Sequence, residues 1–246
     1  MSESAIDPIT SSEPAGPNAA GPSSVTPDTP SAAATTTDAH RSGDAANASS
    51  RDDFDQVRDR ARMQRIGGWH AAAAFAALGL FGAANWWAVG SGTVLAQFAA
   101  LGNAFVAGVV MSSLFHEWGH FAGARLSGAH SPVLSKPVKF YFMFNFDMKN
   151  NSTEQFVWMS LGGILTNWAL AVAALILAPW ETWGGALLVA VFVGQAVNVS
   201  FFEIPVVMRA RETGNPDSAL KQQLENEGLQ RMPGLIVGAL VFLALV

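Results

Sequence analysis

A long stretch of this chain contains no charged side chain. Residues 66–115 include no Asp, Glu, Lys or Arg, whereas a helix needs only about 20 predominantly apolar residues to cross a bilayer. Two glycines in the segment 89–93 interrupt the apolar residues near the middle of this stretch. The stretch therefore predicts two successive membrane-spanning helices, one from about 67 to 89 and one from about 94 onward.

Three more apolar blocks follow. Two of them, 155–177 and 183–205, are long enough to span a membrane, and the last, 232–246, is shorter than a usual span. The last block could be a short span, a span cut off by the end of the chain, or an interfacial helix. The pattern predicts an all-α polytopic membrane protein with four to five transmembrane helices embedded in a lipid bilayer.

Composition narrows the classes of function. Half of the residues are hydrophobic, 13% are charged, and there is no cysteine. Disulfides and thiolate metal sites are therefore excluded, and the lack of a strong basic patch argues against nucleic acid as a partner. The high content of Ala and Gly is typical of a bacterial chain, which favours a bacterial plasma membrane. The oligomeric state does not follow from these features.

The N-terminal part of the chain differs from the rest. Residues 1–50 are rich in Ala, Ser, Thr, Pro, Gly and Asp, and residues 51–65 mix arginines with acids. The first region cannot bury enough apolar surface to offset the entropy cost of ordering. We therefore predict a disordered tail at 1–50, a short polar juxtamembrane helix at 51–65, and a membrane-embedded domain at 66–246.

Basic residues are unevenly distributed among the predicted loops. They precede the first predicted span and follow the second and the fourth, whereas the turn 179–182 carries one acid and no base. Basic residues favour the cytoplasmic side of a membrane. The pattern therefore predicts that the N-terminus, and with it the tail, is cytoplasmic.

The sequence His-Glu-Trp-Gly-His stands at 116–120, directly after the charge-free stretch. On a helix, His116 and His120 share one face and could bind one metal ion. Glu117 lies beside them and could take a proton from a water that zinc activates, as in metalloproteases with this spacing. The alternative is a chance match, with two core histidines bonded to backbone carbonyls. Because ionisable residues are costly inside a membrane, we favour a zinc site.

A catalytic zinc site usually has three protein ligands and one open position, so another element must supply a ligand. Two acids follow at the expected side of the membrane, Glu203 within the fourth apolar block and Asp217 beyond a helix break expected at Pro205. Asp217 could instead be an ordinary turn or N-cap residue. Glu203 could instead pair with Arg209 or Arg211. Spacing alone does not separate the two acids.

The segment 116–128 resembles the site-2 protease family of intramembrane zinc metalloproteases. That family typically reads HExGH, then an Ala-Arg pair, then Gly, and all these features are present here, ending in Gly128. The segment 162–167 is similar to the family's G-P-x-x-N helix, with Ile164 where proline is usual and Asn167 at the last position. The resemblance covers roughly residues 105–220.

A third family element is matched less closely. The family carries an Asn and a Pro in the next helix and then an Asp in an L-D-G context; here Asn198 and Pro205 are farther apart and no L-D-G occurs. Some divergent members carry the Asp in a Gly-rich loop after the Pro, and the segment 214–217 looks most like that. The resemblance therefore implies Asp217 as the third zinc ligand, with Glu203 as the alternative.

The resemblance also implies a fold and an activity. The expected fold is a core of three helices that hold Zn²⁺, with flanking helices. The expected activity is that of a zinc endopeptidase that cleaves membrane-spanning protein substrates near the cytoplasmic side, in regulated intramembrane proteolysis. Its zinc ligands would be His116, His120 and Asp217, and its general base Glu117.

Two rival functions are a catalytically inactive membrane binding module and a metal carrier. An intact Glu117 disfavours an inactive relative. A carrier is expected to place ionisable residues along several spans, and the first and last apolar blocks have none beyond His70.

Residues 138–149 are rich in aromatic side chains, and apolar and polar residues alternate from 144 to 149. The alternation predicts a short interfacial strand. This strand could pair with an extended substrate, or it could be an aromatic anchor at the membrane surface. In the third block, Asn167 could donate a hydrogen bond to a developing oxyanion or could join two helices.

Overall fold

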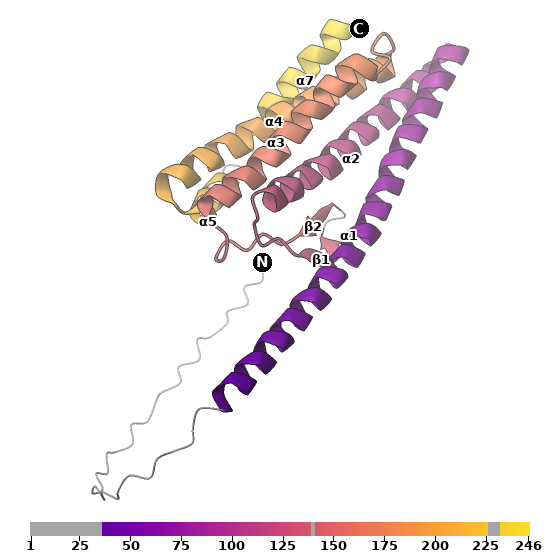
Figure 1. Cartoon of the computed structure of the whole chain (residues 1–246). Helices are drawn as coiled ribbons and strands as arrows, with labels where there is room; N and C mark the ends of the chain where they lie inside the picture. Colours follow the sequence, from indigo (N-terminus) through magenta and orange to yellow (C-terminus); the bar gives the residue numbers. More distant parts are fainter. Residues whose placement is uncertain (1–35, 139–140, 226–231) are drawn as a thin grey trace, which may run out of the picture. The chain divides into compact units, whose positions relative to one another are not determined.

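The computed structural model describes residues 36–138, 141–225 and 232–246 (Figure 1). The chain divides into two compact units, 1–49 and 50–246. Of the first unit, only residues that begin helix α1 are described. The second unit holds the rest of α1 and all the other elements, and it contains the candidate site.

The described part of the chain is built mainly of helices. These are α1 (Thr36–Ser91), α2 (Val94–Leu126), α3 (Thr153–Leu177), α4 (Trp183–Thr213), α5 (Pro216–Leu224) and α7 (Met232–Leu245), with strands β1 (Val133–Val138) and β2 (Phe142–Phe144) between α2 and α3. Four helices are long and apolar enough to cross a membrane: Asp55–Ser91 within α1, α2, α3 and α4. The prediction of an all-α polytopic membrane protein with a small β element is confirmed. Helix α7 is apolar but shorter than these four.

Helix α1 begins earlier than the sequence predicts. Residues 36–50 were expected to belong to a disordered tail, but α1 already starts at Thr36, and residues 1–35 of that tail lie outside the described residues. The polar segment 51–65 is helical as predicted, although as part of α1 and not as a separate helix. Alanine is frequent from 36 to 50 and has the highest helix propensity. The composition of this region is therefore compatible with a helix.

Polar side chains set the starts of the membrane helices. Thr93 accepts a hydrogen bond from the Ala96 amide at the start of α2, and Ser152 and Gln155 form a capping box at the start of α3. Each cap satisfies backbone donors that the first turn leaves free. Helix α1 ends at Ser91 and α2 begins at Val94, so the interruption predicted at 89–93 is confirmed.

The helix break predicted at Pro205 is wrong. Helix α4 continues through Pro205 to Thr213 and ends at Gly214, whose φ of 66° is left-handed. Proline is tolerated within membrane helices where neighbouring packing supports the backbone. Val206 and Val207 are buried directly after Pro205, so packing of α4 holds the helix together on the far side of the proline.

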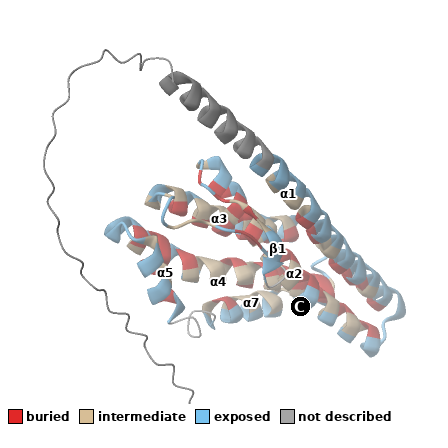
Figure 2. Ribbon diagram, turned by 90° about the horizontal axis from the view of Figure 1, so that it is seen from below, coloured by how far each residue is buried: buried red, intermediate tan, exposed pale blue. Residues whose placement is uncertain are grey.

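Helices α2, α3 and α4 pack together around a shared core (Figure 2). Met111 of α2, Ala171 of α3 and Phe192 of α4 belong to one buried cluster. Glycines let α2 and α3 approach closely, because a Cβ added at Gly119 would collide with the backbone carbonyl of Gly162. This close approach fixes the position of α2 along α3.

Strands β1 and β2 form an antiparallel hairpin. Val133 pairs with Phe144 and Val138 pairs with Phe142, with an irregular register between these pairs. Met143 and Phe144 are buried, whereas Phe142 is largely exposed. The hairpin therefore turns part of β2 toward the helical core.

The strand predicted at 144–149 is wrong in position, because only Phe144 of that segment belongs to a strand. Asp147 ends the extended backbone: its Oδ1 accepts a hydrogen bond of 2.9 Å from the Lys149 amide, and its Oδ2 accepts one of 2.6 Å from the Asn150 side chain. The Lys149 amide is the largest influence that holds the pKa of Asp147 below its ordinary value. This local turn chemistry outweighs the alternating pattern.

The polar start of the second unit holds β1 in place. The Val133 amide donates to Asp59 Oδ1 at 2.6 Å, and Arg62 donates to the Val133 carbonyl at 3.2 Å. Arg65 donates to the Ser135 carbonyl at 2.5 Å. These α1 side chains cover the backbone groups of β1 that do not face β2. The hairpin is therefore fixed between α1 and the core helices.

Candidate metal centre

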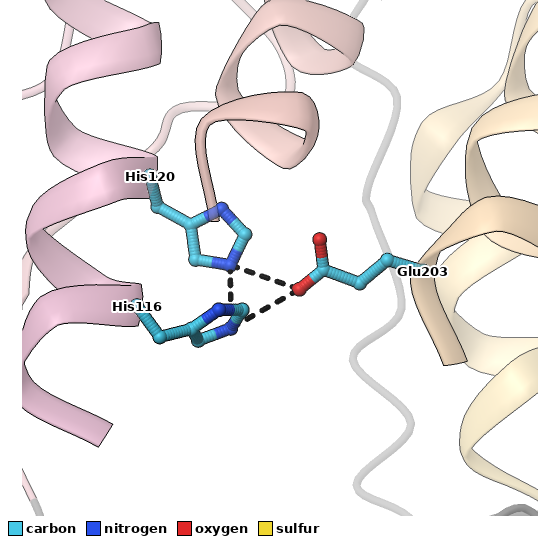
Figure 3. A group of neighbouring side chains, drawn as sticks. All are labelled: His116, His120 and Glu203. Carbon is cyan, nitrogen blue, oxygen red and sulfur yellow. Dashed lines mark hydrogen bonds and ion pairs between the residues drawn. The ribbon is translucent and has the colours of Figure 1, made fainter. Parts of the chain in front are cut away.

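Two histidine rings meet on one face of α2. His116 and His120 are one turn apart, and their Nε2 atoms lie 2.9 Å from each other (Figure 3). Their rings are nearly perpendicular, with centroids 4.2 Å apart. The prediction that the helical spacing brings both imidazoles to one point is confirmed.

The third member of the group is Glu203 from α4. Its Oε1 lies 3.1 Å from His116 Nε2 and 3.0 Å from His120 Nε2 (Figure 3). The three residues form a group that could hold a metal ion. Glu203 is 8% exposed, and its Oε2 has no hydrogen-bond partner among the described residues. A buried carboxylate oxygen without a partner is costly, and a cation between the three side chains would compensate for that cost.

Asp217 does not join this group. It lies in the first turn of α5, where its Oδ2 forms an exposed ion pair of 2.6 Å with Lys221. The structure therefore brings Glu203, and not Asp217, to the two histidines. The reason is the uninterrupted helix α4, which carries the chain about 15 Å along its axis between Glu203 and its end at Thr213.

The ion pair of Glu203 with Arg209 or Arg211, which was the alternative, is not observed among the described residues. Arg209 donates a hydrogen bond of 2.9 Å to Gln223 of α5, while Glu203 faces the histidines.

Helix α3 fixes the orientation of both rings. His120 Nδ1 lies 2.9 Å from the carbonyl oxygen of Met159. Since a carbonyl can only accept, Nδ1 carries the proton and Nε2 keeps a lone pair for a metal. His116 Nδ1 lies 2.8 Å from the side-chain amide of Asn167, which is 1% exposed. Of the two roles expected for Asn167, the observed contact joins α3 to α2 through His116.

Gly163 makes room for the two rings. A Cβ added there would lie 2.5 Å from His120 Cε1 and 2.7 Å from His116 Cε1. No site role was predicted from the sequence for Gly163 or for the Met159 carbonyl. The Gly-Gly pair at 162–163 is a sequence signal for close packing, but a backbone carbonyl leaves no signal in the residue type.

Glu117 points from α2 toward the hairpin. It is 3% exposed, and its Oε1 accepts a hydrogen bond of 3.2 Å from the Met143 amide of β2. Its carboxylate is therefore held beside the histidine group without belonging to it. A carboxylate in this position can accept a proton from a small molecule bound at the group.

Another histidine lies nearby. His70 is 4% exposed and accepts a hydrogen bond of 3.2 Å from Trp118 Nε1. It joins α1 to α2 and is not a member of the metal-binding group.

The site thus combines two imidazole nitrogens and one carboxylate oxygen from two apolar helices, with a second carboxylate at its side. This donor set is one that proteins use for zinc. Comparison of the chain with protein-family models, with curated proteins and with solved structures found no match.

Proposed function

We propose that this protein is an intramembrane zinc endopeptidase. The observation that carries the proposal is the convergence of His116 Nε2, His120 Nε2 and Glu203 Oε1 within 3.1 Å of one another. In the proposal these three residues hold Zn²⁺, and Glu203 replaces Asp217 as the third ligand. Two histidines with one glutamate form a known ligand set of catalytic zinc, which leaves one position open.

Zinc would supply Lewis-acid activation of water and of the scissile carbonyl. The protein's own residues do the rest. Glu117 is the general base that takes a proton from the attacking water, and the Met143 amide orients its carboxylate through their hydrogen bond of 3.2 Å. The Met159 carbonyl keeps the proton of His120 on Nδ1, so that Nε2 remains available.

Asn167 orients the second ring. For His116 Nε2 to bind zinc, Nδ1 must carry the proton and needs an acceptor. A rotation of the Asn167 side-chain amide by 180° exchanges its nitrogen and its oxygen. The oxygen then faces His116 Nδ1 and accepts its proton in a hydrogen bond. In the structure the Asn167 side-chain nitrogen lies 2.8 Å from His116 Nδ1 and donates a hydrogen bond of 3.3 Å to the Gly163 carbonyl, so the turned amide would exchange that bond for one from His116.

The location of the group supports a membrane-spanning protein as substrate. His116 and His120 lie on α2 and Glu203 on α4, and both helices are long and apolar enough to cross a membrane. The last turn of α2 carries Arg125, and the last turn of α4 carries Arg211. Because basic residues favour the cytoplasmic side of a membrane, the C-terminal ends of both helices are proposed to face the cytoplasm. We therefore propose cleavage near the cytoplasmic side of a bacterial plasma membrane, with a cytoplasmic N-terminus and a role in regulated proteolysis.

The hairpin is a candidate docking edge for the unwound substrate. Side chains of α1, among them Asp59 and Arg62, already bind the outer backbone groups of β1. An extended substrate that adds to the sheet would therefore pair with β2, whose Met143 contacts the general base. This arrangement would bring the peptide bond close to Glu117.

Cleavage of a single-span model substrate by the purified full-length protein tests the proposal. The Glu117→Ala variant is expected to lose about a hundred- to ten-thousandfold in rate, because the general base that takes the proton of the attacking water is removed. Zinc content should be unchanged in this variant, since Glu117 is not a ligand. Equal cleavage by wild type and Glu117→Ala, or no zinc in the wild type, would refute the proposal.

A further inference from the structure

A small, partly open cavity borders the metal-binding group. Its volume is about 120 Å³. Six side chains with hydrogen-bonding groups line it: Ser112, Ser113 and His116 of α2, Tyr141 before β2, Asn167 of α3 and Gln195 of α4. We name this cavity the polar chamber. We propose that the polar chamber is a substrate subsite that takes an uncharged hydroxyl or carboxamide side chain next to the scissile bond.

The chamber lies deeper in the membrane segments than the metal-binding group. Ser112 is one helical turn before His116 on α2, and Gln195 is about two turns before Glu203 on α4. Both helices run toward the end where the hairpin attaches, so earlier residues lie farther from that end. The chamber and the group share His116, which places an occupant of the chamber directly beside the reacting bond.

The lining selects the chemical class of the occupant. Apart from His116, no lining residue is ionisable near neutral pH, so a charged side chain would lack a counter-charge there. Ser112 is 3% exposed, and its Oγ has no hydrogen-bond partner among the described residues. A buried hydroxyl without a partner costs free energy inside an apolar bundle. A ligand that can donate or accept a hydrogen bond would remove this cost.

The size of the chamber also fits one side chain. A water molecule takes about 30 Å³ of liquid volume, so a cavity of about 120 Å³ holds about four waters or one side chain of intermediate size. A serine, threonine, asparagine or glutamine side chain fits this space and can bond to Ser112 and Gln195.

The inference rests on the proposed function, and the chemistry of the substrate supports it. A transmembrane helix must unwind before water can reach its peptide bonds. Ser, Thr and Asn favour local unwinding because their side chains compete for backbone hydrogen bonds. The residues that make a segment cleavable are thus polar, and within a membrane they need polar partners when the helix opens.

Synthetic single-span peptides that differ at one residue beside a central Gly-Pro pair test the inference. The test residue is Asn, Ser, Leu or Lys. The zinc-loaded full-length protein should cleave the Asn and Ser peptides at least about tenfold faster than the Leu and Lys peptides, as expected for one buried hydrogen bond that is made or lost. In the double variant Ser112→Ala, Gln195→Leu, the Asn and Leu peptides should be cleaved at similar rates.

Binding of the same peptides to the Glu117→Gln variant separates this inference from the proposed function. The variant should bind the Asn peptide at least about tenfold more tightly than the Leu peptide, and the two chamber substitutions should abolish this preference. Ser200→Ala is the matched control, because its hydroxyl lies on α4 outside the chamber and bonds to the Ala196 carbonyl. That control should keep the preference.

The outcomes distinguish the two claims. Selective binding without hydrolysis by the wild type would support the subsite and refute the endopeptidase. Equal hydrolysis of the Asn and Leu peptides by the wild type, or equal binding of both by Glu117→Gln, would overturn the subsite. The chamber would then hold only water. A preference that survives both chamber substitutions would also overturn it.

Discussion

Gly163 is the residue on which both histidine rings depend for space. Its missing side chain leaves room for the Cε1 atoms of His116 and His120. Rings bound to a metal tolerate little displacement, because ligand geometry must hold within a few tenths of an ångström. A single methyl group at this position therefore acts directly on the metal-binding group.

We expect the substitution Gly163→Ala to weaken zinc binding by about 10- to 100-fold, the range seen when the support of a metal ligand is disturbed. Zinc affinity measured by competition with a chelator checks this. Gly102→Ala is the control, because a Cβ there meets nothing within 4 Å. Equal affinity in both variants would mean that the rings do not hold the metal in the observed arrangement.

The sequence predicts the two histidines of the group reliably because their geometry is local. Positions i and i+4 of one helix always share a face, so His116 and His120 needed no tertiary information. The third residue of the group comes from a different helix, and its identity depends on where α4 crosses α2. Both Glu203 and Asp217 satisfied the sequence criteria, and only the path of α4 through Pro205 distinguishes them in space.

At the scale of elements, the hairpin positions Glu117, the proposed general base. The Met143 amide is the described hydrogen-bond donor to Glu117 Oε1. Phe142 and Phe144, its neighbours in β2, pair with β1. The strand ladder therefore sets the position of the amide that orients the base.

We expect the substitution Met143→Pro to lower kcat by about 10- to 100-fold, because proline removes the backbone donor to a charged acceptor. Zinc content should stay at the wild-type level. Met143→Leu keeps the amide and a similar side-chain volume, and its kcat should remain within about twofold of the wild type. A similar loss in both variants would show that the Met143 side chain matters and not its hydrogen bond.

Most elements of this fold are predictable from apolar length, since the four long membrane helices each contain an apolar block longer than a span. The hairpin is not predictable in the same way. Strand β1 includes Lys136 and Pro137 and lacks an alternating pattern, while the alternating segment after Phe144 turns at Asp147. Contacts from α1 hold β1 in place, and contacts between distant segments leave no periodic signal.

At the scale of the whole described unit, α1 is linked to the hairpin and to the end of α2. Asp59 binds both the Val133 amide and Arg125, the latter at 2.5 Å. Arg125 also donates to the Ser131 carbonyl at 2.9 Å. One carboxylate thus connects α1, the end of α2 and the hairpin.

We expect Asp59→Ala to loosen the hairpin without unfolding the helices. Amide hydrogen exchange at Val133 should accelerate about tenfold, since the substitution removes one partly buried hydrogen bond and one partly exposed ion pair. Exchange within α3 should be unchanged. Arg60→Ala, an exposed change in the same helix, should leave the hairpin as in the wild type, and equal acceleration in both variants would contradict the link.

In the proposed site, Glu203 completes the set of zinc ligands with His116 and His120. The most direct test is the zinc content of the purified full-length protein and its single variants, measured by mass spectrometry after dialysis. We expect about one zinc ion per chain in the wild type and in Asp217→Ala, and nearly complete loss in His116→Ala, His120→Ala and Glu203→Ala. Retention of zinc by Glu203→Ala together with its loss from Asp217→Ala would contradict the account.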